Sequence, residues 1–190
     1  MIKLEGGGVH LSYEHGSGGT SLCLTIARQI LKNKKKVIWL SRYLPDGKRS
    51  SQILKGLTVE ELEKISFIFI ENNLEDSLKK INTLVKLMAL EDLIVVDDWC
   101  QKTGRASKID IIALENMLKI FNNTNIIVSS TSYQNVDSTS SEWESRGGKR
   151  IKEIMRTVFL YRVSEMNNQR IIKEGDELKK IRLLENGFEY

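Results

Sequence analysis

The sequence contains few of the residues that mark a disulfide-stabilised protein or a structural zinc site. Its 190 residues include two cysteines, two histidines and one proline. Cys23 and Cys100 lie far apart in apolar surroundings and form no Cys-x-x-Cys motif. A structural zinc site and a disulfide framework are therefore not expected. Two buried thiols in a reducing cytoplasm are the simplest interpretation.

Long hydrophobic runs are also absent. No apolar stretch approaches the roughly 20 residues that a membrane-spanning helix needs. Residues 1–8 lack the apolar core of a secretory signal peptide. We therefore expect a cytoplasmic protein without membrane contact. The sequence shows no repeat and no low-complexity linker, so residues 1–190 are expected to form one domain with no N-terminal domain before it.

The composition is that of a globular protein with a mild positive charge. Hydrophobic residues make up 41% of the chain and charged residues 28%, and the formal net charge is +4. A chain of this length can bury a substantial core. The charge permits nucleic-acid binding without requiring it.

Residues 13–21, Tyr-Glu-His-Gly-Ser-Gly-Gly-Thr-Ser, are the most informative stretch of the chain. They follow a predicted strand at residues 9–13 and open a predicted helix at residues 20–33. A strand, a glycine-rich turn and a helix N-terminus are the layout of a phosphate-binding P-loop. In such a loop, backbone N–H groups and the helix dipole bind an anion.

Two positions depart from the P-loop pattern. Tyr13 stands where the pattern has its first glycine, and Gly19 stands where it has lysine. An aromatic side chain at the first position should disturb the turn, because glycine there allows a conformation that other residues resist. The sequence therefore predicts the scaffold of a nucleotide site without its principal positive charge.

The rest of the chain alternates apolar strand runs with amphipathic helical patterns. Predicted strands fall at residues 37–40, 67–70, 93–96, 126–128 and 157–161, and a terminal meander follows at 171–172 and 181–184. This order predicts an α/β fold with a mainly parallel sheet flanked by helices. A ligand would then lie at the carboxyl ends of the strands, where the glycine-rich loop and Asp97 both fall.

Local patterns predict several boundaries between these elements. Residues 41–55 are polar, with a turn at residues 45–47. Thr58 with Glu61 matches a capping box, and Asn72 or Asn73 caps a helix with apolar positions as far as Met88. Residues 129–148 have no periodicity, and long irregular stretches in compact domains are usually functional or disordered.

Taken in order, these segments resemble the ATPase core of the RecA/RadA recombinases over nearly the whole chain. The resemblance is carried by the glycines at residues 6–8, the 16–21 loop, the strand at 37–40, a Walker-B-like strand at 93–98, and the ending at 146–151 and 156–160. The branch that it resembles is the short archaeal RadB-like and RadA-paralogue proteins. The resemblance implies a RecA-like P-loop core with a β-rich C-terminal meander.

The resemblance also implies a vestigial nucleotide site, a degenerate Walker A. Its residues would be Gly16, Ser17, Gly18, Gly19, Thr20, Ser21 and Asp97. Thr20 and Asp97 keep the positions of the family's Mg²⁺-side pair. Tyr43 stands in place of the catalytic Glu that positions the attacking water in that family. With both the acid and the lysine replaced, we expect a pseudo-ATPase with no catalytic residue, no resident metal and no cofactor beyond weak ATP/Mg²⁺ binding.

In this family two loops face DNA, and the corresponding segments here carry cations and aromatic residues. The resemblance makes Lys102, Arg105 and Lys108 of the first loop, and Tyr133, Arg146, Lys149 and Arg150 of the second, candidate DNA-binding residues. Tyr133 and Trp143 are candidates for base stacking. Two other interpretations stay open: exposed cations often only solvate a surface, and Trp143, flanked by Glu142 and Glu144, suits a protein contact equally well.

The function implied by the resemblance is assistance to homologous recombination and DNA repair. The expected partners are single-stranded DNA and a RadA-type recombinase or another paralogue. None of the phenylalanines is followed by alanine three residues later, so filaments of the Phe-x-x-Ala type are not expected. Two alternatives remain: a divergent ATPase whose lysine is supplied by Lys48, Arg49 or a partner chain, and a KaiC-like regulatory scaffold acting through protein contacts.

Overall fold

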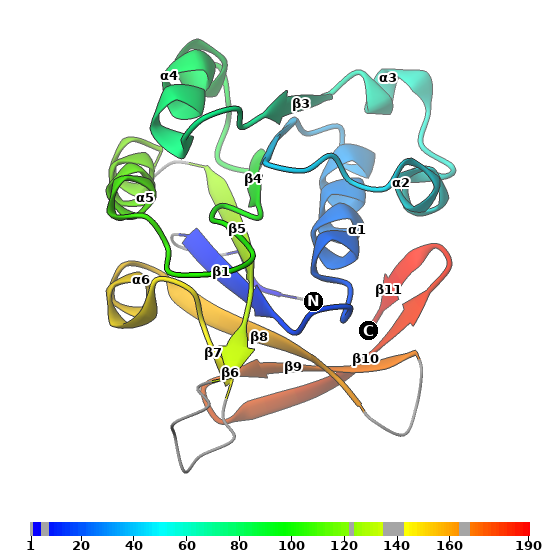
Figure 1. Ribbon diagram of the computed structural model, residues 1–190. Coiled ribbons are helices and arrows are strands. Elements are labelled where there is room, and N and C mark those ends of the chain that lie inside the picture. The colour runs from blue at the N-terminus through cyan, green and yellow to red at the C-terminus, as the bar shows by residue number, and fades with distance from the viewer. Residues whose placement is uncertain (1, 5–7, 122–123, 135–142, 164–167) are drawn as a thin grey trace.

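The computed structural model describes the chain except residues 1, 5–7, 122–123, 135–142 and 164–167 (Figure 1). Gly6 and Gly7 of the resemblance therefore lie outside the described residues. The strands of the main sheet are Gly8–Tyr13 (β1), Val37–Ser41 (β2), Ile65–Phe69 (β3), Leu93–Asp97 (β4), Asn125–Thr131 (β5), Arg156–Arg162 (β8), Gln169–Glu174 (β9), Glu177–Leu184 (β10) and Gly187–Glu189 (β11). Tyr133–Gln134 (β6) and Trp143–Glu144 (β7) form a separate small hairpin.

The main sheet runs in the order β11-β10-β9-β8-β1-β5-β4-β2-β3. The strands from β8 to β3 pair in parallel, and β9, β10 and β11 continue the sheet in antiparallel fashion. The predicted α/β fold with a mainly parallel sheet and a terminal meander is confirmed. Because the parallel strands end at one edge, Tyr13, Ser41 and Asp97 all reach the same side of the molecule.

The helices are Gly19–Lys32 (α1), Gly47–Leu54 (α2), Val59–Leu62 (α3), Leu74–Val85 (α4), Lys108–Ile120 (α5) and Gly148–Ile154 (α6). In Figure 1, α1 and α2 lie on one side of the sheet, and α4, α5 and α6 lie on the other. Alternating strand residues supply both cores: Val37 and Trp39 face α1, whereas Ile38 and Leu40 face α4 and α5. This two-sided burial explains the unbroken apolar runs in the sequence.

The predicted helix caps are confirmed, whereas two predicted boundaries differ from the structure. Thr58 and Glu61 form the predicted capping box, and Asn73 caps α4 by accepting a hydrogen bond from the Asp76 N–H at 2.9 Å. However, α4 ends at Val85, so Met88 lies beyond it. Residues 41–55 are not merely a polar turn region, because Asp46 caps the short helix α2 through the Arg49 N–H at 2.7 Å.

The prediction that residues 129–148 are irregular is wrong at both ends. β5 continues to Thr131 because its backbone pairs with β1 as far as Tyr13, and a ladder forms whatever the side-chain polarity. The hairpin of β6 and β7 follows, and residues 135–142 between them lie outside the described residues.

The expectations for the cysteines and for membrane-spanning helices can be compared with the structure. Cys23 and Cys100 are both buried and unbonded, as expected. Among the described residues, no helix combines the length and the apolar character that a membrane crossing requires.

Candidate functional site

The glycine-rich turn joins β1 to α1 at the carboxyl edge of the sheet. Gly16 and Gly18 have φ angles of 75° and 97°, in the left-handed region that glycine adopts without strain. Gly19 is the first residue of α1, and the Thr20 Oγ1 donates to Asp97 Oδ2 at 3.0 Å. The structure thus brings Asp97, at the end of β4, against the N-terminus of α1. Ser17 is buried within the turn.

Tyr13 and Gly19 are in direct contact. A Cβ atom added to Gly19 would lie 2.3 Å from Cδ1 of the Tyr13 ring, a distance that real atoms do not tolerate. Tyr13 is 6% exposed, and its hydroxyl donates to Asp98 Oδ1 at 2.5 Å. Tyr13 keeps its place in β1, opposite Thr131 and Leu160, and α1 begins at Gly19 beside the ring. The two departures from the P-loop pattern, Tyr13 and Gly19, therefore depend on each other, because the ring of the first fills the space beside the second.

Two adjacent carboxylates are satisfied by neighbouring donors. Asp97 Oδ1 accepts from the Ser129 hydroxyl at 2.5 Å, in addition to the bond from Thr20. Asp98, with a φ of 52°, accepts from Tyr13 and forms an ion pair with Lys102 at 3.2 Å. Burial and the neighbouring Asp98 charge raise the pKa of Asp97 to about 6. Burial and the same two carboxylates raise the pKa of Tyr13, which keeps the phenol protonated as a donor.

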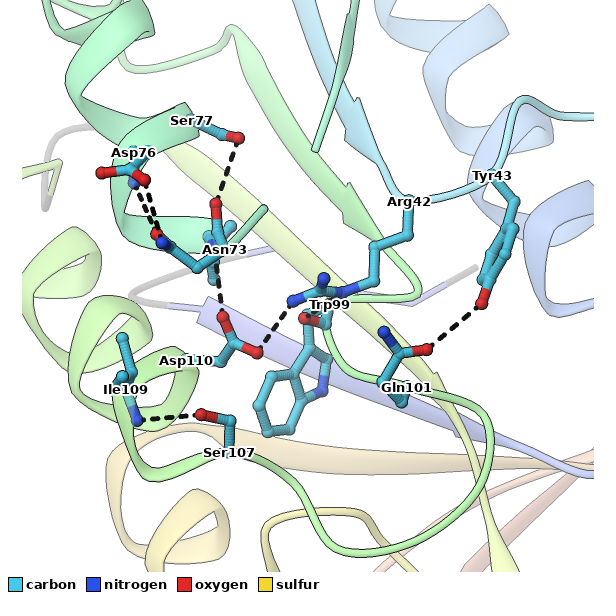
Figure 2. A network of polar contacts seen from close by, with 11 residues as sticks. Arg42, Tyr43, Asn73, Asp76, Ser77, Trp99, Gln101, Ser107, Ile109 and Asp110 are labelled. Carbon is cyan, nitrogen blue, oxygen red and sulfur yellow. Dashed lines mark hydrogen bonds and ion pairs between the residues drawn. The ribbon is translucent and has the colours of Figure 1, made fainter. Parts of the chain in front are cut away.

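A pocket of about 260 Å³ lies beside these carboxylates. Tyr43 is on its rim, with 46% of its surface exposed, and its hydroxyl donates to Gln101 Oε1 at 3.3 Å (Figure 2). Lys102 Nζ lies 4.6 Å from the centroid of the Tyr43 ring, which suits a cation–π contact. The structure therefore places Tyr43 and Lys102 at the edge of the pocket that Thr20 and Asp97 also line.

Arg49 also lines this pocket, but its guanidinium is already bound. It donates to the carbonyl oxygens of Leu184 and Glu185 at 2.7 Å each, and to the Ser21 hydroxyl at 3.2 Å. These bonds connect α2 and α1 to the turn after β10. Arg170 makes a similar contact from β9, donating through Nε to the Ser17 carbonyl at 2.9 Å. The C-terminal meander therefore braces the glycine-rich turn.

The donor set does not match the one that a P-loop offers to a magnesium–triphosphate. The Tyr13 ring leaves no space for any side chain at position 19. Lys102 is neutralised by Asp98, and each oxygen of Asp97 already accepts a hydrogen bond. Among the described residues, no group of three or more His, Cys, Asp or Glu side chains is arranged to hold a metal ion.

A buried ion pair anchors the loop that follows β4 (Figure 2). Arg42 Nη2 lies 2.8 Å from Asp110 Oδ2, and each side chain is 8% exposed. Arg42 Nε also donates to the Trp99 carbonyl at 3.2 Å, and Asp110 Oδ1 accepts from the Leu74 N–H at 3.0 Å. Sequence reasoning missed this pair, although an arginine directly after a buried strand and an acid in the first turn of an apolar helix were visible.

The two predicted DNA loops meet, and Arg146 joins them. Its guanidinium donates to the carbonyl of Lys102 at 2.6 Å, to that of Gly104, and to that of Thr131 at 3.4 Å. It also lies 5.2 Å from the centroid of the Tyr133 ring. Tyr133 in turn donates to Glu144 Oε2 at 3.0 Å. Arg146 therefore holds the loops together at the side of a hollow of about 550 Å³.

Comparison with known proteins gives a structural match. No family model matches the chain, and no curated protein matches its sequence. A solved structure described as a DnaB-like replicative helicase and its interactions with primase superposes with a TM-score of 0.68 at 13% identity. The match covers 96% of this chain and 57% of the helicase chain. The fold is RecA-like.

Within this RecA-like fold, most of the predicted DNA-contacting cations have partners. Arg150 forms a two-point pair with Glu115, with an Nη2–Oε2 distance of 2.9 Å, and Lys149 lies 3.8 Å from Glu153. Lys102 and Arg146 are engaged as described above. Arg105 and Lys108 are exposed and make no ion pair with the described residues. Trp143 packs against Tyr161, with ring centroids 6.2 Å apart.

Proposed function

We propose that this chain is a non-catalytic RecA-like module of homologous recombination and DNA repair, of the RadB-like or RadA-paralogue kind. It would act by binding single-stranded DNA, a RadA-type recombinase, or both. The observation that carries the proposal is the Tyr13 ring on Gly19, which takes the space that the P-loop lysine needs. A RecA-like fold that lacks a working ATP-hydrolysis site favours a binding role.

The proposed loss of ATP hydrolysis follows from what phosphoryl transfer requires. A charge-assisted contact from a lysine contributes roughly 1.5–3 kcal/mol to binding, and its neutralisation of transition-state charge matters more for rate. The residue beside the pocket in place of a water-positioning acid is Tyr43, whose phenol is bonded to Gln101. Among the described residues that line the pocket, none is therefore evidently placed to catalyse hydrolysis.

Nucleic-acid binding is favoured by the junction of the two loops. Arg105 and Tyr133 share the wall of one hollow, and Lys108 is exposed nearby at the start of α5. A cation for phosphate and a ring for base stacking are the ordinary components of a single-strand site. Arg146 is assigned a positioning role here, because its guanidinium holds the loop carbonyls.

The test is a fluorescence anisotropy titration with a labelled single-stranded oligonucleotide at several salt concentrations. Binding should weaken as salt rises, because phosphate contacts release counterions. A pull-down with the cognate RadA-type recombinase is run in parallel. If the chain binds neither the oligonucleotide nor the recombinase at low salt, the proposal is wrong. A stable complex with some other protein, without DNA affinity, would instead favour the KaiC-like scaffold.

A divergent ATPase is the second candidate, favoured by one observation. Thr20 and Asp97 remain adjacent beside a pocket that Lys102 and Arg49 also line. If either cation exchanges its present partners for the nucleotide phosphates, Mg-ATP should raise the apparent melting temperature, because a ligand of the native state stabilises it. ATP turnover that is abolished by Asp97→Ala would establish this alternative and refute the non-catalytic proposal.

A further inference from the structure

The C-terminal strands present a second surface, distinct from the two predicted DNA loops and from the glycine-rich turn. One face of β8, β9 and β10 packs on α1, through Val158, Leu160, Ile172 and Ile181. Because strand residues alternate between faces, the residues between these point to the opposite side. In Figure 1 these strands lie at the lower edge of the molecule, and no described helix lies beneath β9 and β10. This opposite side is called the outer face below.

The first component of the outer face is a row of aromatic rings. Phe159 and Tyr161, two residues apart on β8, stack with centroids 5.7 Å apart and planes inclined by 10°. Trp143 from β7 adds a third ring, 6.2 Å from Tyr161. All three side chains are partly exposed. Rings exposed in this way on a sheet form a platform on which unpaired bases stack.

The second component is a set of cations placed beside the rings by the strand register. Lys173 on β9 lies opposite Phe159, and Lys180 on β10 lies opposite Ile171, itself the partner of Tyr161. Arg182, two residues after Lys180, lies on the same face. None of these three cations forms an ion pair with another described residue. An acid also lies on this face, since Glu189 is opposite Arg182.

The face is open and hollowed at its outer edge. Leu178, opposite Lys173, is 67% exposed, and Lys180 and Arg182 are exposed beside it. A hollow of about 470 Å³ is lined in part by Gln169, Lys180, Arg182 and Tyr190. These side chains can donate hydrogen bonds to phosphate oxygens or base edges.

We propose that the outer face binds single-stranded nucleic acid, with bases on Trp143, Phe159 and Tyr161 and phosphates at Lys173, Lys180 and Arg182. This rests on the proposed function in taking single-stranded nucleic acid as the ligand, but it assigns the main contact to the sheet instead of the loops. The cations match a polyanion, and the rings require unpaired bases, so a duplex is a poorer ligand than a single strand.

The adjacent residues Lys179 and Lys180 provide a matched pair for the test. Both are exposed, but Lys179 lies opposite the buried Ile172 and belongs to the α1 side. With a labelled 20-nucleotide oligothymidylate, Lys180→Glu should weaken binding about fivefold or more and lower the salt slope by about 1. Lys179→Glu should change the affinity less than about twofold. Oligouridylate is titrated in parallel to compare RNA with DNA.

Intrinsic fluorescence supplies an independent readout. Trp39 and Trp99 are fully buried, so Trp143 is the tryptophan on which a base can stack. Titration with unlabelled oligothymidylate should quench tryptophan emission, and Trp143→Phe should remove the quenching. A hairpin duplex at the same concentration should quench less.

The outcomes separate this inference from the proposed function. If the wild type binds neither DNA nor recombinase, the proposed function fails and the outer face fails with it. If Arg105→Ala with Lys108→Ala abolishes binding while Lys180→Glu and Trp143→Phe retain wild-type affinity and quenching, the outer face is wrong and the proposed function stands. Equal affinity for the duplex, or binding of an acidic protein in place of nucleic acid, also overturns the inference.

Discussion

The glycine-rich turn between β1 and α1 and the outer face of β8–β10 use similar residues in opposite ways. Around this turn, Asp98 accepts a hydrogen bond from Tyr13 and pairs with Lys102, and Arg49 is bound to backbone carbonyls. On the outer face, Tyr161 stacks beside Phe159, while Lys180 and Arg182 extend into solvent. A cation that is bound internally contributes to stability, whereas an exposed one is available to a ligand.

This difference arises from burial. A charge removed from water must be paired, and breaking such a pair is costly. A surface charge has no such requirement, and its removal changes stability little. The comparison therefore predicts that substitutions near the glycine-rich turn mainly change stability, whereas substitutions on the outer face mainly change binding.

The largest effect is expected at the ion pair that anchors the loop after β4. Asp110→Ala should lower the free energy of unfolding by about 3–5 kcal/mol, because it leaves Arg42 buried without its partner. Urea unfolding followed by circular dichroism measures this change. Glu75→Ala, which breaks the exposed pair with Lys79, is the control and should have little effect. Equal losses in the two variants would refute the distinction between buried and exposed charges.

The contact of Tyr13 with Gly19 predicts a smaller cost. Gly19→Ala should lower the free energy of unfolding by about 1–3 kcal/mol, because the new Cβ forces the ring to move. Gly47 is a matched control, since it is likewise the first residue of a helix, but a Cβ there would meet no described residue within 4 Å outside its chain neighbours and its own helix backbone. Gly47→Ala should leave stability unchanged or slightly raised. A tolerated Gly19→Ala would show that position 19 is not sterically closed.

A pH effect on stability is expected from His10, a fully buried residue of β1. Complete burial lowers the pKa of His10 from 6.5 to about 3. Below pH 6.5 the unfolded chain therefore binds a proton that the native state does not. Stability should fall as the pH decreases from 6.5 towards 3, by at most about 1.4 kcal/mol per pH unit from this group.

The two histidines of the chain allow this contribution to be isolated by urea unfolding between pH 7.5 and 5. His10→Gln, which keeps an acceptor near the Trp99 indole, should lose that part of the pH dependence. His15→Gln, at an exposed position, should retain it. If both variants keep the wild-type pH dependence, the assignment to His10 is wrong.

The smallest effect is expected on the outer face. Lys180→Ala and Arg182→Ala should change the free energy of unfolding by less than about 0.5 kcal/mol, because both side chains are exposed without ion-pair partners among the described residues. The same urea assay measures this. A loss comparable to that of Gly19→Ala would mean that these cations support the fold and are not reserved for a ligand.

Part of the candidate site could be predicted from local sequence. The strand–turn–helix pattern placed Gly16–Thr20 correctly, and the end of an apolar strand placed Asp97 near it. The Arg42–Asp110 pair could not be predicted, because its partners are 68 positions apart and meet only when α5 packs beside β2 and β4. The outer face also depends on register: only strand pairing puts Lys173 beside Phe159.

The sequence by itself determined the alternation of strands and helices, the two-sided core and the missing lysine, since these follow from periodicity and residue identity. The tertiary structure decided what occupies the space beside position 19 and which cations are exposed. Tyr13 and Gly19 are local neighbours whose contact depends on where the ring points, and that direction is set by Asp98 across the sheet edge. Whether an arginine or lysine is paired or exposed is decided by long-range packing, which residue type alone does not encode.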